Sequence, residues 1–201
     1  MPPIRTASNQ VEAALLDAAQ VVLERDGLDA VTIRAVAAEA GVAPMGVYNR
    51  FTNKDGLLTA LSRRAFDALR AAVDVREPAD PVERLRASCR AYRTFALEHG
   101  ELYGLLFSGA RPLRPRTPLA EHGRAVFAVL TGLVEASGLA GPDAHLAARI
   151  VWNAIHGAAA IEGVGLLGED DAAVAYEATL DVLIAGLGAP SELPARRSTR
   201  I

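Results

Sequence analysis

Apolar residues recur at spacings of three and four along most of the chain, and this spacing predicts α-helices. The first run covers residues 11–22, and Asn9 and Glu12 are placed to form a capping box at its start. Gly27 offers the left-handed conformation in which helices commonly end. The first helix is therefore expected to end at about Arg25.

Three more helix starts follow before residue 56. Thr32 is placed to cap a short second helix, and Gly41 ends it. Pro44 suits the first turn of a short third helix, and residues 52–54 turn the chain into a fourth. Ala43 has no side-chain oxygen to act as a cap, so the third helix depends on Pro44 for its start.

Longer helical segments fill the rest of the chain. They are expected at residues 55–76, 81–99, 101–107, 119–136, 143–163 and 171–187. Residues 108–118, rich in proline and arginine, are expected to form a surface loop, and the tail from Pro190 to fray. We therefore predict an all-α chain, with a three-helix head (residues 1–54) and a larger helical body (residues 55–201).

Composition excludes several classes of protein. Aromatic residues make up 5% of the chain and apolar residues 51%, a balance that favours close-packed helices. The single cysteine, Cys89, cannot form an internal disulfide, and the longest uncharged stretch, residues 150–161, is too short to span a membrane. No secretory signal is present at the amino end, so a cytoplasmic location is expected. A net charge of −3 does not decide whether one face binds DNA.

Residues 32–51 have the spacing of a helix-turn-helix motif. Ala37, four residues before Gly41, leaves room for two helix axes to cross closely. The residues expected to fill the space between the helices are Val36, Val42 and Val47. Residues 32–54 contain three basic side chains and one acid, Glu39. A helical hairpin with no role in DNA binding could have the same spacing.

The run TIRAVAAEAGVAPMGVYNRFTNKDGLL, residues 32–58, closely resembles the signature of the TetR family of bacterial transcriptional repressors. The resemblance covers the whole order of the chain, from a three-helix DNA-binding head to a helical regulatory body. Residues 91–108 and 151–162 resemble the subgroup whose C-terminal domain is named WHG for its Trp, His and Gly, here Trp152, His156 and Gly157. The resemblance implies a repressor, not an enzyme, that leaves a palindromic operator when a small molecule binds.

The resemblance also assigns DNA contacts by position. Thr32 is expected to cap the second helix and to offer its hydroxyl or amide to a phosphate, and Tyr48 to bind a backbone oxygen. Lys54, the only lysine in the chain, is the expected phosphate anchor, because the positive end of the fourth helix faces the same phosphate. Arg34 and Arg50 are either further phosphate contacts or simply solvated.

The exposed front of the third helix, which reads bases in this family, falls on Pro44, Met45, Gly46 and Asn49. The first three offer little hydrogen bonding. We therefore expect Asn49 to read a base directly, and Pro44 or Met45 to contact thymine methyl groups.

The last helix carries two apolar stripes. One consists of Tyr176, Leu180, Leu183, Ile184 and Leu187, and the other of Val174, Ala178, Val182 and Ala185. Two apolar faces need two partners, so a homodimer through the last two helices is expected. The alternative is a core helix pair within a monomer.

The resemblance further implies an effector pocket in the helical body. The candidate residues are Phe66, Tyr92, Phe95, Tyr103, Phe107, Phe127, Trp152 and His156. Ordinary core packing is the alternative for each aromatic ring. The set contains no acid and no strong base, so an apolar to amphipathic ligand is expected. His156, one turn after Trp152, is either a satisfied core residue or a donor to the ligand.

Other functional motifs fail in their context. Gly163, Gly165 and Gly168 spell GxGxxG, but they follow a helix and not a strand. The four histidines lack metal-ligand spacing, and Cys89 is expected to pack inside its helix. No cofactor, metal or catalytic group is predicted. The competing class is a helical binding protein or enzyme whose head has lost its affinity for DNA.

Overall fold

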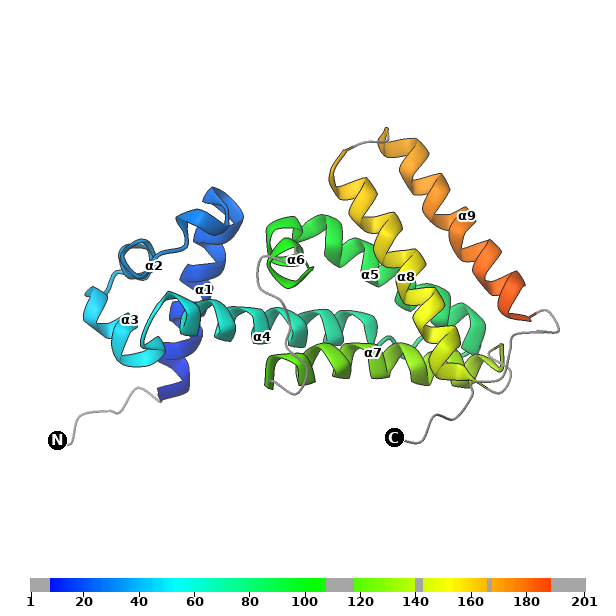
Figure 1. Cartoon of the computed structure of the whole chain (residues 1–201), viewed down its shortest axis with the longest axis horizontal. Helices are drawn as coiled ribbons and strands as arrows, with labels where there is room; N and C mark the ends of the chain where they lie inside the picture. The colour runs from blue at the N-terminus through cyan, green and yellow to red at the C-terminus, as the bar shows by residue number, and fades with distance from the viewer. Residues whose placement is uncertain (1–7, 108–117, 140–142, 166–167, 189–201) are drawn as a thin grey trace, which may run out of the picture. The chain divides into compact units, whose positions relative to one another are not determined.

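The computed structural model describes residues 8–107, 118–139, 143–165 and 168–188, and these residues form α-helices and one 3-10 turn but no strand. The predicted all-α fold is confirmed (Figure 1). The elements are α1 (Ser8–Asp26), η1 (Leu28–Ala30), α2 (Ile33–Glu39), α3 (Pro44–Phe51), α4 (Lys54–Val73), α5 (Pro81–Glu98), α6 (Gly100–Phe107), α7 (Pro118–Ser137), α8 (Ala144–Gly163) and α9 (Glu169–Gly188). Residues 108–117 of the predicted loop lie outside the described residues, and so does the predicted tail from Pro190.

The chain divides into two compact units. Unit one consists of Met1–Asp74 and Ala91–Val126, and unit two of Val75–Arg90 and Phe127–Ile201. Both units draw on α5 and α7, whose amino-terminal and carboxyl-terminal parts belong to different units. The predicted division at residue 54 concerns function, and it stays a prediction.

In unit one, α1 packs against α2 and α4, and α3 packs against α2 and α4. Val36 and Val47 are fully buried between these helices, as the spacing predicts, and Ala37 is buried where the helices cross. The prediction for Val42 is wrong, because its side chain is 42% exposed. Gly41 has a φ of +66°, and this turn directs the next residue outward.

The helix starts and stops of the head follow their local signals. Gly27 has a φ of +81° directly after α1. The Oγ1 atom of Thr32 accepts a hydrogen bond from the amide of Ala35 at 3.1 Å, so Thr32 caps α2 as predicted. Pro44 occupies the first turn of α3, and Ala43 before it provides no side-chain cap.

The capping box predicted at Asn9 and Glu12 is wrong. Because α1 begins at Ser8, Asn9 already lies within the helix. The Glu12 carboxylate instead accepts hydrogen bonds from Arg50 of α3 and, at 3.2 Å, from Arg63 of α4. Glu12 thus joins α1 to both α3 and α4.

The turn between α3 and α4 is tight and specific. Thr52 has a φ of +65°, and the amide of Asn53 donates to the carbonyl of Phe51 at 2.6 Å, which makes a three-residue γ-turn. The Oδ1 atom of Asn53 then caps α4 by accepting from the amide of Gly56 at 2.8 Å. A Cβ at residue 56 would collide with the Phe51 carbonyl. These residues fix the direction in which α4 leaves α3.

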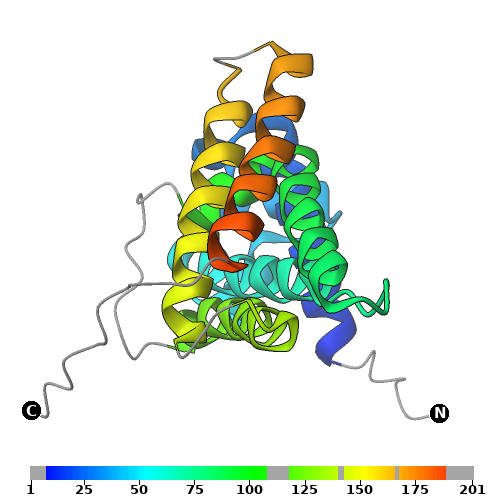
Figure 2. The same ribbon diagram turned by 90° about the vertical axis from the view of Figure 1, so that its right-hand side faces the viewer.

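In unit two, α8 and α9 run antiparallel and side by side in both views (Figures 1 and 2). Tyr176 and Leu180 of α9 are 1% exposed and fill the core together with Val151 and Ile155 of α8. Burying such side chains contributes about 2 kcal/mol each, so this face of α9 is held mainly by apolar packing.

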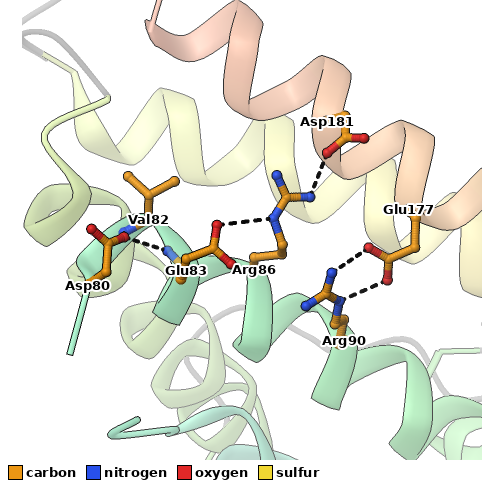
Figure 3. Close-up of polar contacts among 7 residues, drawn as sticks. All are labelled: Asp80, Val82, Glu83, Arg86, Arg90, Glu177 and Asp181. Atoms are coloured by element: carbon orange, nitrogen blue, oxygen red, sulfur yellow. Dashed lines mark hydrogen bonds and ion pairs between the residues drawn. The ribbon is translucent and has the colours of Figure 1, made fainter. Parts of the chain in front are cut away.

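Polar contacts fix α9 on the first part of α5 (Figure 3). Arg86 pairs with Asp181 at 2.7 Å, and Arg90 makes two hydrogen bonds to Glu177 at 2.8 and 2.7 Å. Asp181 is largely exposed and Glu177 partly exposed, so such pairs contribute about 1 kcal/mol or less each. These ion pairs therefore set the register of α9 more than its stability.

The carbonyl of Cys89 accepts a hydrogen bond from the Tyr176 hydroxyl at 2.6 Å. Cys89 itself packs inside α5 as predicted, and burial raises the pKa of its thiol to about 12. The thiol is therefore uncharged at neutral pH.

Candidate nucleic-acid interface

The predicted DNA-contacting residues all lie in unit one, on α2, α3 and the residues that flank them. Seven of them are exposed: Thr32, Arg34, Pro44, Met45, Gly46, Tyr48 and Asn49. Met45 is 64% exposed and Tyr48 48%, although both are large side chains that normally gain from burial. The structure thus leaves this face of α3 without cover from its own unit.

The polar groups of this face are available for a ligand. Arg34, Tyr48 and Asn49 make no hydrogen bond or ion pair with any other residue that the structure describes. Thr32 uses an oxygen lone pair to cap α2, and its hydroxyl proton stays free to donate outward. Four donors are therefore presented along a short surface.

Lys54 has a second role that the sequence did not indicate. Its Nζ atom donates to the backbone carbonyls of Leu28 and Asp29 at 3.5 and 3.4 Å, at the turn η1 that precedes Thr32. An ammonium group has three donors, so two carbonyls leave one for a phosphate. Lys54 therefore ties the start of α4 to the turn η1, which precedes α2.

Arg50 is placed differently from Arg34. It is half-buried, and its guanidinium pairs with Glu12, which also binds Arg63. Arg50 thus connects α3 to α1. Glu12 and Arg63 were not among the predicted site residues, because nothing in their local sequence marks their partners 38 and 51 residues away.

The charge of the face is positive although the chain as a whole is acidic. Glu39, the acid of α2, pairs with Arg25 at 2.9 Å. Hydrogen bonds to Asp26 and Glu39 raise the pKa of Arg25 above its ordinary value. Because Arg25 balances Glu39, the charges of Arg34 and Lys54 are not offset by that acid.

Most of the predicted effector residues form a packed aromatic cluster in unit one. Tyr92 and Tyr103 join their hydroxyl groups at 3.1 Å, and burial raises the pKa of Tyr103. The ring centroid of Phe107 lies 4.9 Å from that of Tyr103 and 5.9 Å from that of Phe66. Phe95 is also buried, and its ring centroid lies 5.1 Å from that of His99. The role of this cluster in effector binding stays a prediction.

Phe127 and Trp152 belong to unit two, where they line a pocket of about 320 Å³. The other lining residues are His145, Arg149 and Asn153, none of which was predicted. A usable signal was present, since residues 145, 149, 152 and 153 share one face of a helix. His156, one turn further on, is half-buried, and burial lowers its pKa below the ordinary value.

Comparison with known proteins places the chain among transcriptional regulators. Residues 15–61 match the family model described as "Bacterial regulatory proteins, tetR family". Residues 85–186 match the model "Tetracyclin repressor-like, C-terminal domain", which covers half of the chain. The chain belongs to the TetR family.

Relatives of this TetR-family chain match it over nearly its full length. It is 27% identical to the uncharacterised HTH-type transcriptional regulator Rv0681 of Mycobacterium tuberculosis, over 87% of this chain and 80% of the relative. A protein of unknown function from Rhodococcus sp. RHA1 is 30% identical, with a TM-score of 0.80, covering 94% of this chain and all of that one. The structure of BioQ of Mycobacterium smegmatis is 25% identical, with a TM-score of 0.60, and the match covers 88% of this chain and 97% of BioQ.

Membership of the TetR family establishes a DNA-binding transcriptional regulator and not an enzyme. The head matched by the first model contains α2 and α3 with their exposed face. None of the described helices meets the length and hydropathy needed to cross a membrane. The assignment to the WHG-type subgroup stays a prediction.

Proposed function

We propose that this TetR-family regulator is a repressor that binds a roughly palindromic operator as a homodimer and leaves it when a small molecule binds. The observation that carries the proposal is the exposed face of α2 and α3, on which Arg34, Tyr48 and Asn49 have no partner among the described residues. Exposed donors on a short helix suit the major groove of DNA.

Phosphate binding is assigned to Thr32, Arg34, Tyr48 and Lys54. Their donors flank the start of α2 and the recognition helix α3, where the two strands of the backbone would pass. Arg50 lies on the same helix but is held by Glu12, so it is either a phosphate contact that changes partner or a residue that positions α3.

Base reading is assigned to the front of α3. Asn49 offers both an amide donor and an acceptor, which match the major-groove edge of adenine. Met45 and Pro44 are exposed and apolar, as contacts with thymine methyl groups require. Gly46 follows them and has no side chain, so the helix can approach the base edges closely.

Dimerisation is assigned to α8 and α9. Val174 and Val182 of α9 are 71% and 73% exposed, and Ile161 of α8 and Val164 directly after it are 50% and 70% exposed. Such apolar side chains gain free energy when a second copy covers them. A dimer places two recognition helices in successive major grooves, about 34 Å apart.

Release requires that the effector bind more tightly to a form of the dimer that does not fit the operator. The candidate residues for this site are the aromatic cluster of unit one (Phe66, Tyr92, Phe95, Tyr103 and Phe107) and Phe127, Trp152 and His156 of unit two. We also propose that the protein acts in the cytoplasm, where bacterial DNA is found.

The test is fluorescence anisotropy with a labelled duplex taken from the DNA upstream of the protein's own coding region. At two salt concentrations, we expect this duplex to bind at least about a thousandfold more tightly than a scrambled duplex. Equal and weak binding of both duplexes would favour the competing class, a helical protein without specific affinity for DNA.

A further inference from the structure

We propose that the pocket between α7 and α8 in unit two binds a small aromatic carboxylate. The pocket has a volume of about 320 Å³ and is lined by Phe127 of α7 and by four residues of α8. This volume lies at the lower end of the range for small-molecule sites and suits a ligand of one or two rings.

Aromatic rings form the wall of the pocket. The Phe127 ring packs edge to face with Trp152 at a centroid distance of 5.9 Å and with His145 at 5.1 Å. A flat ring of the ligand can pack against these surfaces in the same offset or edge-to-face manner. The wall therefore selects an aromatic ligand over a flexible polar one.

The polar groups at the pocket identify the charge of the ligand. Arg149 and Asn153 are exposed and make no hydrogen bond or ion pair with other described residues. A guanidinium binds a carboxylate through two parallel, charge-assisted hydrogen bonds, and the Asn153 amide can donate a third. No acid stands among the described residues that line the pocket to compete for Arg149.

A phosphate ester fits this pocket less well than a carboxylate. Phosphate sites commonly combine several cations with backbone amides, whereas among the described residues one arginine lines this pocket. One guanidinium is enough to pair with both oxygens of a planar carboxylate. The ring and the acid together thus define the ligand class.

The pocket does not coincide with the surface proposed for dimerisation. Successive residues of a helix are rotated by about 100°, so Arg149, Trp152 and Asn153 share one face of α8. The exposed Ile161 is rotated by about 120° from Arg149 and so lies on a neighbouring face, and the exposed Val164 follows the carboxyl end of α8. A ligand can therefore enter without displacing the proposed partner from those residues.

If the pocket is the effector site, the inducer of this regulator is an aromatic acid. That consequence rests on the proposed function, but binding itself can be measured without DNA. Trp152 is the only tryptophan of the chain, so its fluorescence reports on this pocket alone.

The experiment titrates the full-length protein with benzoate and phenylacetate while Trp152 fluorescence is recorded. We expect a saturable change with a dissociation constant of about 1 mM or tighter for at least one acid. Benzamide, which has the same ring but no charge, should bind at least about tenfold more weakly. Thermal unfolding with and without each compound provides a second reading of binding.

Arg149→Leu should lose the preference for the acid over the amide, with a loss of at least about tenfold in benzoate affinity. Arg70→Leu, at an exposed arginine of α4 in unit one, is the matched control and should bind like the unchanged protein. Arg149 is exposed, so the variant is expected to fold, and circular dichroism checks this.

Three results would overturn the proposal: no saturable change in fluorescence or melting temperature up to about 10 mM acid, benzamide binding as tightly as benzoate, or unchanged benzoate affinity in Arg149→Leu. A failure of the proposed function is a different result, namely the absence of specific DNA binding. The two outcomes can be told apart because the titration contains no DNA.

Discussion

Single side chains of the head divide into those that position the helices and those that are available to DNA. Asn49 and Arg34 have no partners among the described residues, whereas Lys54 and Arg50 are tied to other helices or turns of the head. The local sequence shows the type of each residue, but it does not show which distant residue a side chain pairs with. For this reason the capping by Thr32 could be predicted, whereas the pairing of Arg50 with Glu12 could not.

Lys54→Ala should weaken binding to every DNA sequence to a similar degree. Loss of one phosphate contact lowers the slope of log K against log salt by about one. The measurement is anisotropy on a specific and a scrambled duplex across a salt series. Because Lys54 also binds the carbonyls of η1, thermal unfolding is measured in parallel. An unchanged slope in a folded variant would remove Lys54 from the phosphate contacts.

Arg50 and Glu12 can be tested as a pair. If Arg50 positions α3 through Glu12, then Arg50→Ala and Glu12→Ala should each weaken specific binding, and the double variant should be no weaker than either single one. The salt slope should stay unchanged, since no phosphate contact is lost.

The opposite pattern would assign Arg50 to the phosphates. In that case Glu12→Ala would release Arg50 from this ion pair and remove a negative charge, so DNA binding would become tighter. Arg50→Ala alone would then lower the salt slope by about one. Urea unfolding of each variant separates both patterns from a simple loss of stability.

At the scale of the helices, the sequence predicts starts and stops well, because caps and breakers act within a few residues. Gly27, Gly41, Thr32 and Pro44 each have the role that their chemistry predicts. The exposure of Val42 depends on the direction of the chain after a glycine with positive φ, and periodicity does not carry that information.

The pocket in unit two could not be predicted as a pocket. Phe127 and Trp152 were identified by residue type, but their joint position with Arg149 depends on how α7 packs against α8. That packing is a tertiary property. The helical spacing of residues 145, 149, 152 and 153 gave only their shared face.

The γ-turn between α3 and α4 predicts a sharp contrast between two glycines. Gly56→Ala should destabilise the protein by about 2 kcal/mol, because the new Cβ would collide with the Phe51 carbonyl. Gly104→Ala, within α6 and with open space around the added carbon, should be neutral or stabilising by up to about 1 kcal/mol. Urea unfolding measures both, and equal effects at the two sites would contradict the described turn.

At the scale of the whole molecule, the proposed function requires two copies. Of the two stripes predicted on α9, Tyr176 and Leu180 are buried in unit two, whereas Val174 and Val182 are left uncovered by their own chain. A stripe of this kind favours the dimer over a core helix pair in a monomer, but the oligomeric state itself stays a prediction.

Val182→Glu should weaken the dimer by about tenfold or more, because a symmetric interface would bury two carboxylates without partners. Analytical ultracentrifugation across a concentration series measures the effect. Val21→Glu, the same substitution at an exposed valine of α1, is the control and should leave the assembly unchanged. Equal dissociation constants for the two variants would place the interface elsewhere.

The central claim is that the exposed front of α3 reads DNA bases, and selection of duplexes from a random pool tests it most directly. The unchanged protein should enrich a two-fold symmetric consensus whose half-sites lie about 10 base pairs apart. Asn49→Ala should relax the preference at one base pair in each half-site and keep the rest of the consensus. The account would be contradicted if the pool yields no consensus, or if the variant selects the same sequence with unchanged preference at every position.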